Sequence, residues 1–241
     1  ANGQYERALL QIGQFRNLCS DLLEEGSFAA LSLKVWESWS LIYSGMEFER
    51  AESILQDVLS SLDHLSDQFE PEFDKWRLKL LMAYAQDITG YLYRSRGDFA
   101  KAVEYYRKNI RLWRELRVES EHANTLNNLS WSLAEIGDFQ AAMSHCDDGL
   151  DLRRKLGHRY AIALSLTTFG LIETRNGQPE RARFRCEQAL GIFRDLEQPR
   201  GIGLACNALA EALRRMTNVA DLLTDEQSLK NLELAEQYAK E

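Results

Sequence analysis

The chain has 241 residues, of which 45% are hydrophobic, and its 37 acidic and 29 basic side chains give a net charge of −8. An acidic protein has no general attraction to nucleic acid or to anionic membranes, so neither is expected as a direct partner. No stretch approaches the roughly 18 apolar residues of a membrane helix, and the N-terminus lacks the apolar segment of a signal peptide. Four dispersed cysteines and only three prolines favour a reduced, cytoplasmic, all-α protein.

A short motif recurs along the chain. It reads Gly-Asp-Phe-x-x-Ala at Gly97 and at Gly137, and Gly-Gln-Pro-x-x-Ala at Gly177, so that the three glycines are 40 residues apart. Related copies begin at Gly3 and at Gly45, the second with one extra residue. Self-similarity at a fixed period of this length predicts a stack of repeated supersecondary units.

The similarity extends beyond the motif. Seven residues before the glycine stands a small residue, four before it a large one, and thirteen after it an aliphatic one: Ser38, Gly90, Ser130 and Gly170; Leu41, Tyr93 and Leu133; Ile110, Leu150 and Leu190. Small residues let two helices approach closely, and glycine ends the first helix in the left-handed conformation. The aspartate that follows can cap the second helix. Glu173, in the large-residue slot, departs from this pattern.

In chain order, we expect helices over residues 28–44, 46–62, 72–96, 98–117, 119–136, 138–156, 159–176, 179–197 and 200–217, with a longer connection over 63–71. They form one solenoid over residues 1–241. It comprises a partial repeat at 1–26, repeats at about 28–70, 72–117, 119–157 and 158–198, and a last repeat at 199–241 with an irregular loop at 218–227. The opening in mid-repeat suggests a fragment of a longer chain. A helix resumes near Ser228.

The small residue, large residue, Gly-Asp-aromatic turn and following alanine resemble the tetratricopeptide repeat. This resemblance implies an all-α fold, a right-handed α-α superhelix of helical hairpins. The spacing exceeds the common period of about 34 residues and implies longer helices. Residues 126–129 and 192–201 look like the long repeats of bacterial signal-transducing NTPase regulators of the STAND class, and are also similar to those of kinesin light chain-like adaptors.

Sequence motifs for catalysis are missing. The four histidines show no H-E-x-x-H pattern, and neither a phosphate-binding glycine loop nor G-x-S-x-G occurs. We therefore expect no enzyme activity, no cofactor and no metal. Cys146 and Cys186 share one repeat position and are expected in the core. Trp76 and Trp113 are expected on the outer side, packing between helices.

In the resembling family the first helix of each hairpin lines the concave side, and positions ten, six and three before the turn glycine share one helical face. The face and its neighbours predict this partner-binding groove: Trp39, Tyr43, Tyr84, Asp87, Tyr91, Arg94, Asn124, Asn127, Asn128, Trp131, Glu135, Thr167, Arg175, Asn207, Glu211 and Arg214. Trp39, Tyr91 and Trp131 occupy the same slot in successive repeats and would form an aromatic ladder. The alternative is that these aromatics pack against neighbouring repeats and that the asparagines cap or bridge hairpins.

These features predict a protein-interaction or ligand-sensing module of a larger signalling or transcriptional regulator. The partner would be a protein or peptide, with a small signalling ligand as another possibility. The alternative is a passive scaffold or adaptor that links partners without a signalling step. An enzyme would need a catalytic domain outside these residues.

Overall fold

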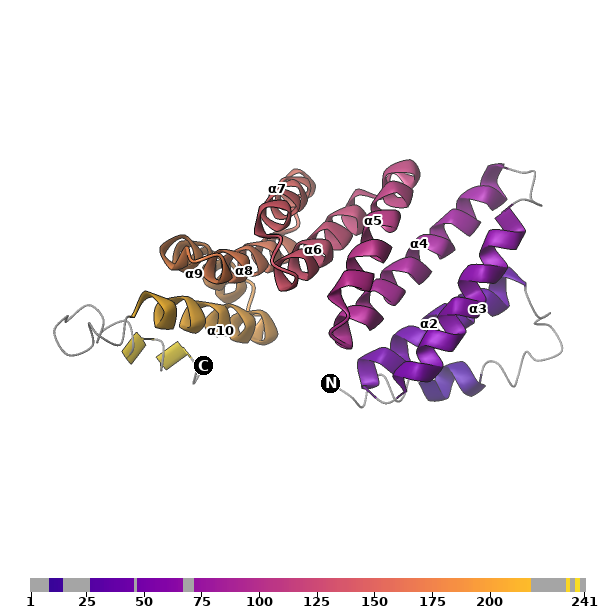
Figure 1. The fold of residues 1–241 in the computed structure, drawn as a ribbon, viewed down its shortest axis with the longest axis horizontal. Coiled ribbons are helices and arrows are strands. Elements are labelled where there is room, and N and C mark those ends of the chain that lie inside the picture. The colour runs from indigo at the N-terminus through magenta and orange to yellow at the C-terminus, as the bar shows by residue number, and fades with distance from the viewer. Residues whose placement is uncertain are drawn as a thin grey trace. The chain divides into compact units, whose positions relative to one another are not determined.

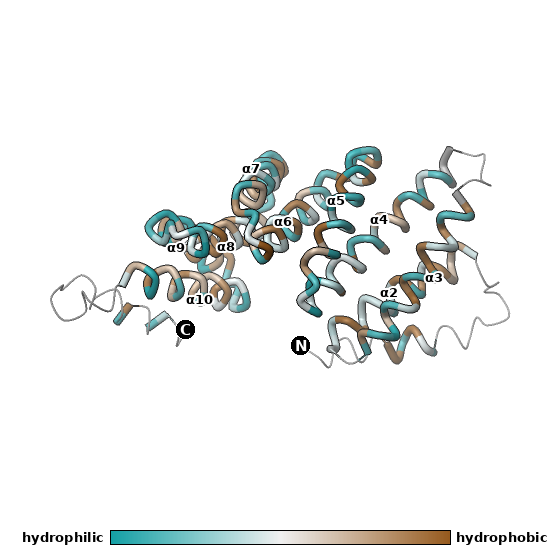
Figure 2. Tube along the Cα trace, viewed as in Figure 1, coloured by the Kyte–Doolittle hydropathy of each residue, from teal (hydrophilic) through white to brown (hydrophobic). Residues whose placement is uncertain are grey.

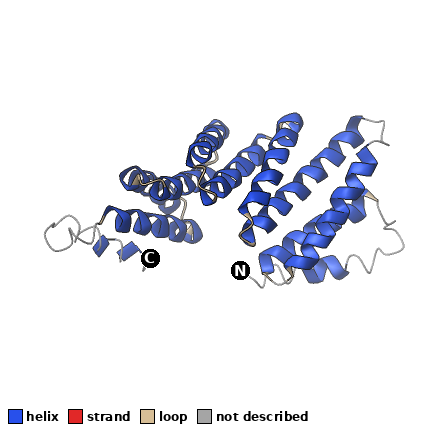
Figure 3. Ribbon diagram, viewed as in Figure 1, coloured by secondary structure: helices blue, strands red, loops and turns tan. Residues whose placement is uncertain are grey.

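The computed structural model describes residues 9–14, 27–45, 47–66, 72–217, 233–234 and 237–238. Within these residues the chain is all-α and contains no strand (Figure 3). Its contacts divide it into two compact units, Ala1–Val118 and Glu119–Glu241. The motif copy at Gly3, the loop after residue 217 and most of the final predicted helix lie outside the described residues.

Nine helices, α2 to α10, have defined bounds in the described part of the chain, and each corresponds to a predicted one (Figure 1). Residues 9–14 are also helical. The first unit holds α2 (Phe28–Ser44), α3 (Phe48–Ser66), α4 (Glu72–Ser95) and α5 (Phe99–Leu116). The second holds α6 (Glu119–Glu135), α7 (Phe139–Leu156), α8 (Arg159–Arg175), α9 (Pro179–Asp195) and α10 (Pro199–Met216). One bound was wrong: α3 continues to Ser66, so the connection predicted to begin at residue 63 is shorter.

The turn glycines of the three regular copies have equivalent backbone geometry. Gly97, Gly137 and Gly177 have φ of 80°, 86° and 75°, in the left-handed region that only glycine adopts without strain. Each glycine N–H donates to the carbonyl three residues back, and the next N–H donates to the carbonyl five residues back. These two hydrogen bonds close the last turn of the first helix and confirm the predicted repeat register.

The second helices begin as the sequence predicts. The Asp98 carboxylate accepts from the backbone N–H of Lys101, and the Asp138 carboxylate accepts from that of Ala141, both at 3.2 Å. Each aspartate thus satisfies one of the free donors of a helix start. Pro179 lies in the first turn of α9, where its missing N–H costs no hydrogen bond.

Within each unit, the first helices of successive hairpins pack against one another. Within the first unit α2 contacts α4, and within the second α6 contacts α8 and α8 contacts α10. In the described residues, α3 makes no such contact with α5, nor α7 with α9. Because the first helices approach more closely than the second ones, each unit curves with its first helices on the inner side. In Figure 2 the second helix α9 is hydrophilic over much of its visible length.

The small-residue slot is a point of close approach between the two helices of a hairpin. Ser38, Ser130 and both glycines of this slot are buried. A Cβ added at Gly90 would lie 2.6 Å from the ring of Tyr106, and one added at Gly170 would lie 2.4 Å from the Cys186 sulfur. The predicted core positions of Cys146 and Cys186 are confirmed, since both side chains are buried.

We expect Gly90→Ala to lower the free energy of unfolding by about 1–3 kcal/mol, because the buried Tyr106 ring has no space to move away from the added methyl group. On helix propensity alone, the same change would raise it by about 1 kcal/mol. Gly191→Ala is the matched control, since Gly191 lies within α9 and an added Cβ meets no atom within 4 Å. Urea unfolding followed by circular dichroism measures both variants. An equal gain in both would contradict the close approach.

Candidate partner-binding surface

The predicted groove residues of the first unit form an aromatic cluster on α2 and α4. The Trp39 ring lies 4.5 Å from Tyr43 and 5.4 Å from Tyr91, between centroids. The Tyr43 and Tyr91 rings stack at 5.3 Å with only 6° between their planes. The Arg94 guanidinium lies 4.7 Å above the Tyr91 ring. All four side chains are half-buried, so the cluster retains exposed aromatic and cationic surface.

Tyr84 lies two turns before Tyr91 on α4 and links this surface to the core. Its ring contacts the exposed Trp36 at 5.9 Å and meets the buried Trp113 edge-on at 5.2 Å. Asp87 is half-buried on the same helix. Trp113 lies on the second helix α5 and packs between the helices of its hairpin, as expected: its side chain is 0% exposed, because it lies against Ala83 and Tyr84. Trp76, in contrast, is 43% exposed.

In the second unit Trp131 lies on α6 beneath an ion pair. The Arg175 guanidinium of α8 lies 4.7 Å from the Trp131 ring centroid and forms an ion pair with Glu135. The three predicted groove residues are therefore brought together, and one face of the indole is already covered by a cation. For the ladder, the structure joins Trp39 to Tyr91. Trp131 belongs to the other unit, so its place in the ladder stays a prediction.

Three asparagines precede Trp131 on α6, and all three are half-buried. The Asn124 side chain donates to the Glu121 carboxylate at 3.1 Å and accepts from the Arg153 guanidinium at 2.8 Å. The Asn127 side-chain oxygen has no hydrogen-bond partner among the described residues. Asn128 lies beside it, and its backbone carbonyl accepts from the Ser132 hydroxyl at 3.0 Å. Amides of this kind can donate and accept together, as a partner's main chain requires.

The last predicted residues lie on α8 and α10. The prediction that Thr167 lines the groove is wrong. Its side chain is only 5% exposed and its hydroxyl donates to the Ala163 carbonyl at 2.9 Å, so it does not line an open surface. Asn207 and Arg214 are exposed on α10. Glu211 is half-buried and pairs with Arg215 at 3.1 Å.

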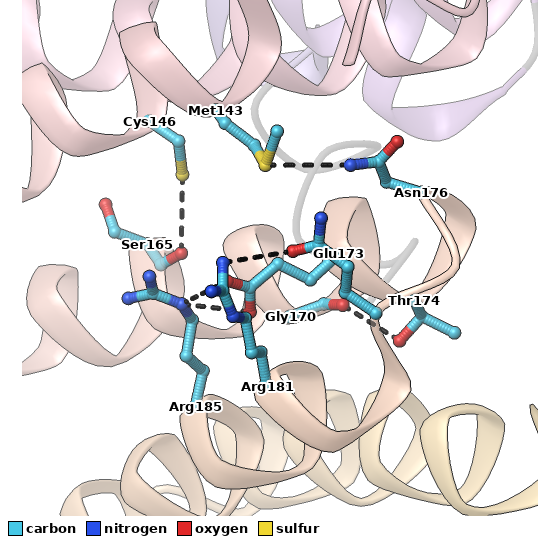
Figure 4. A network of polar contacts seen from close by, with 10 residues as sticks. Met143, Cys146, Ser165, Gly170, Glu173, Thr174, Asn176, Arg181 and Arg185 are labelled. Carbon is cyan, nitrogen blue, oxygen red and sulfur yellow. Dashed lines mark hydrogen bonds and ion pairs between the residues drawn. The ribbon is translucent and has the colours of Figure 1, made fainter. Parts of the chain in front are cut away.

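The outer side of the second unit carries a pocket that the sequence pattern did not predict. It has a volume of about 460 Å³ and is lined by Glu173 of α8 and by Glu180, Arg181, Phe184 and Arg185 of α9. Arg185 donates to both Glu173 oxygens at 2.9 Å and lies over the Phe169 ring at 3.6 Å. Figure 4 shows this pair below Met143 and Cys146 of α7.

Burial dominates the titration of this region. Desolvation raises the pKa of Glu173 above that of an ordinary glutamate, although Arg185 opposes the shift. Burial also raises the pKa of Cys146 and of Cys186 to about 12, so neither thiol is a reactive thiolate at neutral pH. Within the described residues no group of histidine, cysteine and carboxylate side chains could hold a metal ion. None of the helices described there is long and apolar enough to cross a membrane.

Comparison with known proteins agrees with the repeat geometry. The family model for the tetratricopeptide repeat matches residues 89–155, which include the turns at Gly97 and Gly137. Residues 89–155 therefore carry tetratricopeptide repeats. No curated protein matches the sequence.

Several solved structures have a similar fold over nearly the whole chain. BtubC (BKLC) from P. vanneervenii is 16% identical, with a TM-score of 0.67, and the match covers 99% of this chain and 89% of that one. The apo form of RapI is 14% identical, with a TM-score of 0.67 and coverages of 98% and 89%. A STAND protein with a tetratricopeptide repeat sensor from Pyrococcus horikoshii is 10% identical, with a TM-score of 0.68 and coverages of 98% and 36%. This chain therefore spans about a third of that STAND protein.

Proposed function

We propose that this tetratricopeptide chain binds an extended segment of a partner protein on a first-helix surface, the solvent-exposed faces of the first helices within a unit: those of α6, α8 and α10 in the second unit and, separately, those of α2 and α4 in the first. The observation that carries the proposal is the exposure of Trp39, Tyr91 and Trp131, which share one repeat slot. All three stay half-buried, although a core position such as that of Trp113 excludes solvent completely. Partly exposed aromatic and arginine side chains are the groups that dominate binding energy at protein interfaces.

The asparagines of α6 favour a polypeptide as the partner. Asn124 and Asn127 lie one turn apart on the surface that carries Trp131, and an extended main chain presents donors and acceptors in alternation. The net charge of −8 argues against nucleic acid. A small signalling ligand would have to use the same aromatic and amide groups.

We further propose that the chain serves as the sensing part of a larger signalling or transcriptional regulator in the cytoplasm. Its support is the fold shared with a STAND protein whose tetratricopeptide repeats form a sensor. The full reading frame tests this role. A nucleotide-binding or DNA-binding domain in the same frame is expected, whereas a frame with no other domain favours the passive adaptor.

The binding surface is tested with a peptide selected from a random phage-displayed library against the whole chain. We expect Trp131→Ala to lower the affinity for that peptide by at least about tenfold, because an aromatic anchor is lost. Isothermal titration calorimetry measures the affinity, and circular dichroism checks the fold.

The matched control is Phe184→Ala, since Phe184 is 62% exposed on α9, on the outer side of the same unit. It is expected to leave the affinity unchanged. Peptides that respond to Phe184→Ala and not to Trp131→Ala would overturn the proposal.

A further inference from the structure

Arg153 is a buried cation at a position that is apolar in the three other repeats that the structure describes there. The equivalent residues of the other copies, aligned on the turn glycine, are Leu62, Trp113 and Phe193, each 0% exposed. Arg153 is 4% exposed, and its three hydrogen bonds go to neutral oxygens, while the Glu121 carboxylate acts on it as a nearby charge. A buried charge of this kind costs free energy that a leucine or phenylalanine would not. Its presence therefore calls for a role beyond packing.

The side chains around Arg153 are also polar, whereas those around its equivalents in neighbouring repeats are apolar or aromatic. Its guanidinium donates to the Asn124 side-chain oxygen at 2.8 Å, to the Ser165 hydroxyl at 2.6 Å and to the Ala161 carbonyl at 2.8 Å. One repeat later the residues at these three positions are Leu164, Ala205 and Gly201, and all three belong to or pack around the core of Phe193. In the preceding hairpin the matching contact is that of Tyr84 with Trp113. The third repeat thus replaces an apolar contact with a polar set.

This polar set fixes the direction of one amide on the first-helix surface. A guanidinium has only donors, so the atom of Asn124 that faces Arg153 must be the oxygen. The Asn124 nitrogen then points away from the core, where Glu121 accepts one of its hydrogens. The second hydrogen has no hydrogen-bond partner among the described residues. Burial lowers the pKa of Arg153 only to about 10, so the cation persists at neutral pH.

We propose that Arg153 is a positioning residue for partner binding: it holds the Asn124 amide with its nitrogen outward, to donate to a carbonyl oxygen of the partner's main chain. This inference rests on the proposed function of the first-helix surface. Arg153 touches no partner itself and acts through Asn124. The proposal also accounts for a charge placed at a position where an apolar side chain would fill the space.

The first test needs no partner. In the wild-type chain, the side-chain amide of Asn124 is expected to give a separate NMR signal, and the hydrogen bonded to Glu121 is expected to exchange slowly with water, because Arg153 holds the amide oxygen in place. In the Arg153→Phe/Ser165→Ala variant, which copies Phe193 and Ala205 of the next repeat, that signal is expected to move and to exchange faster. Since these residues form a packed core one repeat later, the variant is expected to stay folded. An unchanged Asn124 signal in a folded variant would overturn the positioning role.

The second test uses the phage-selected peptide with three variants: Asn124→Leu, Arg153→Phe/Ser165→Ala, and the two combined. Each of the first two variants is expected to bind the peptide with about tenfold lower affinity. The combination is expected to lose no more than either alone, because both remove the same donor. Arg153→Lys with Asn124 intact is expected to retain part of the affinity.

The outcomes separate the two proposals. If the peptide depends on Trp131 but on neither Asn124 nor Arg153, the positioning role is wrong and the surface stands. If Asn124→Leu weakens binding and Arg153→Phe/Ser165→Ala does not, Arg153 is structural only. If Trp131→Ala also leaves the affinity for the peptide unchanged, the proposed function itself is wrong.

Discussion

Replacing Arg185 with alanine is expected to lower the free energy of unfolding of the second unit by about 3–5 kcal/mol at neutral pH. The change leaves the Glu173 carboxylate, which is 2% exposed, without the two hydrogen bonds that compensate its burial. It also removes the guanidinium from the face of Phe169. Urea unfolding followed by circular dichroism measures the loss.

The double variant Glu173→Leu/Arg185→Leu is the control. Leu133 and Leu213 occupy the equivalent slot in neighbouring repeats and are fully buried. Because a buried ion pair can often be replaced by apolar residues at little cost, the double variant is expected to be close to wild type or more stable. A double variant as unstable as Arg185→Ala would show that the charges themselves are required.

The pH dependence of Arg185→Ala follows from the sign of the Glu173 shift. Burial already raises the folded-state pKa of Glu173 above its unfolded value, so the folded protein binds this proton more tightly than the unfolded one. Such a group favours folding below the unfolded pKa and loses that contribution as the pH rises through the folded pKa. Arg185 opposes the rise in the Glu173 pKa, so its removal raises the folded-state pKa further and extends to higher pH the range over which protonated Glu173 favours folding. The variant is therefore expected to regain stability relative to wild type as the pH is lowered from neutral, and Glu173→Gln should abolish this recovery.

Trp113→Ala is expected to lower the free energy of unfolding of the first unit by about 3–5 kcal/mol. The indole fills the space between the two helices of its hairpin, where it contacts Tyr84 edge-on, and its removal leaves a cavity that the rigid repeat cannot close.

Trp76→Ala serves as the comparison in the same unit, because this side chain is 43% exposed. Its expected loss is below about 1 kcal/mol. Thermal unfolding of the two variants ranks them, and similar losses would contradict the assignment of Trp113 to the core.

The repeat frame could be predicted because its signals are local. A glycine that needs the left-handed conformation, an aspartate that caps the next helix and a proline in a first turn each act within a few residues. Gly97, Asp138 and Pro179 therefore lie where the pattern placed them. The end of α3 was missed because no glycine or proline stops that helix before Ser66.

Side-chain burial was harder to predict, because it depends on neighbouring helices. Thr167 and Trp131 belong to the same predicted face, yet Thr167 is covered and Trp131 is half-buried. The sequence pattern also treated Glu173 only as a departure, without indicating its partner Arg185. Arg153 could have been found by aligning the position sixteen residues after each turn glycine, where it follows Trp113 and precedes Phe193.

The most direct test of the binding surface is a paramagnetic relaxation measurement on the unmodified chain. The phage-selected peptide carries a nitroxide label, and the indole N–H signals of the five tryptophans report its position. Trp131 supplies the only indole of residues 119–241, and Trp76 is an exposed indole outside the first-helix set. We predict broadening of the Trp131 or Trp39 signals with Trp76 unaffected. Broadening of Trp76 alone would contradict the assignment of binding to the first helices.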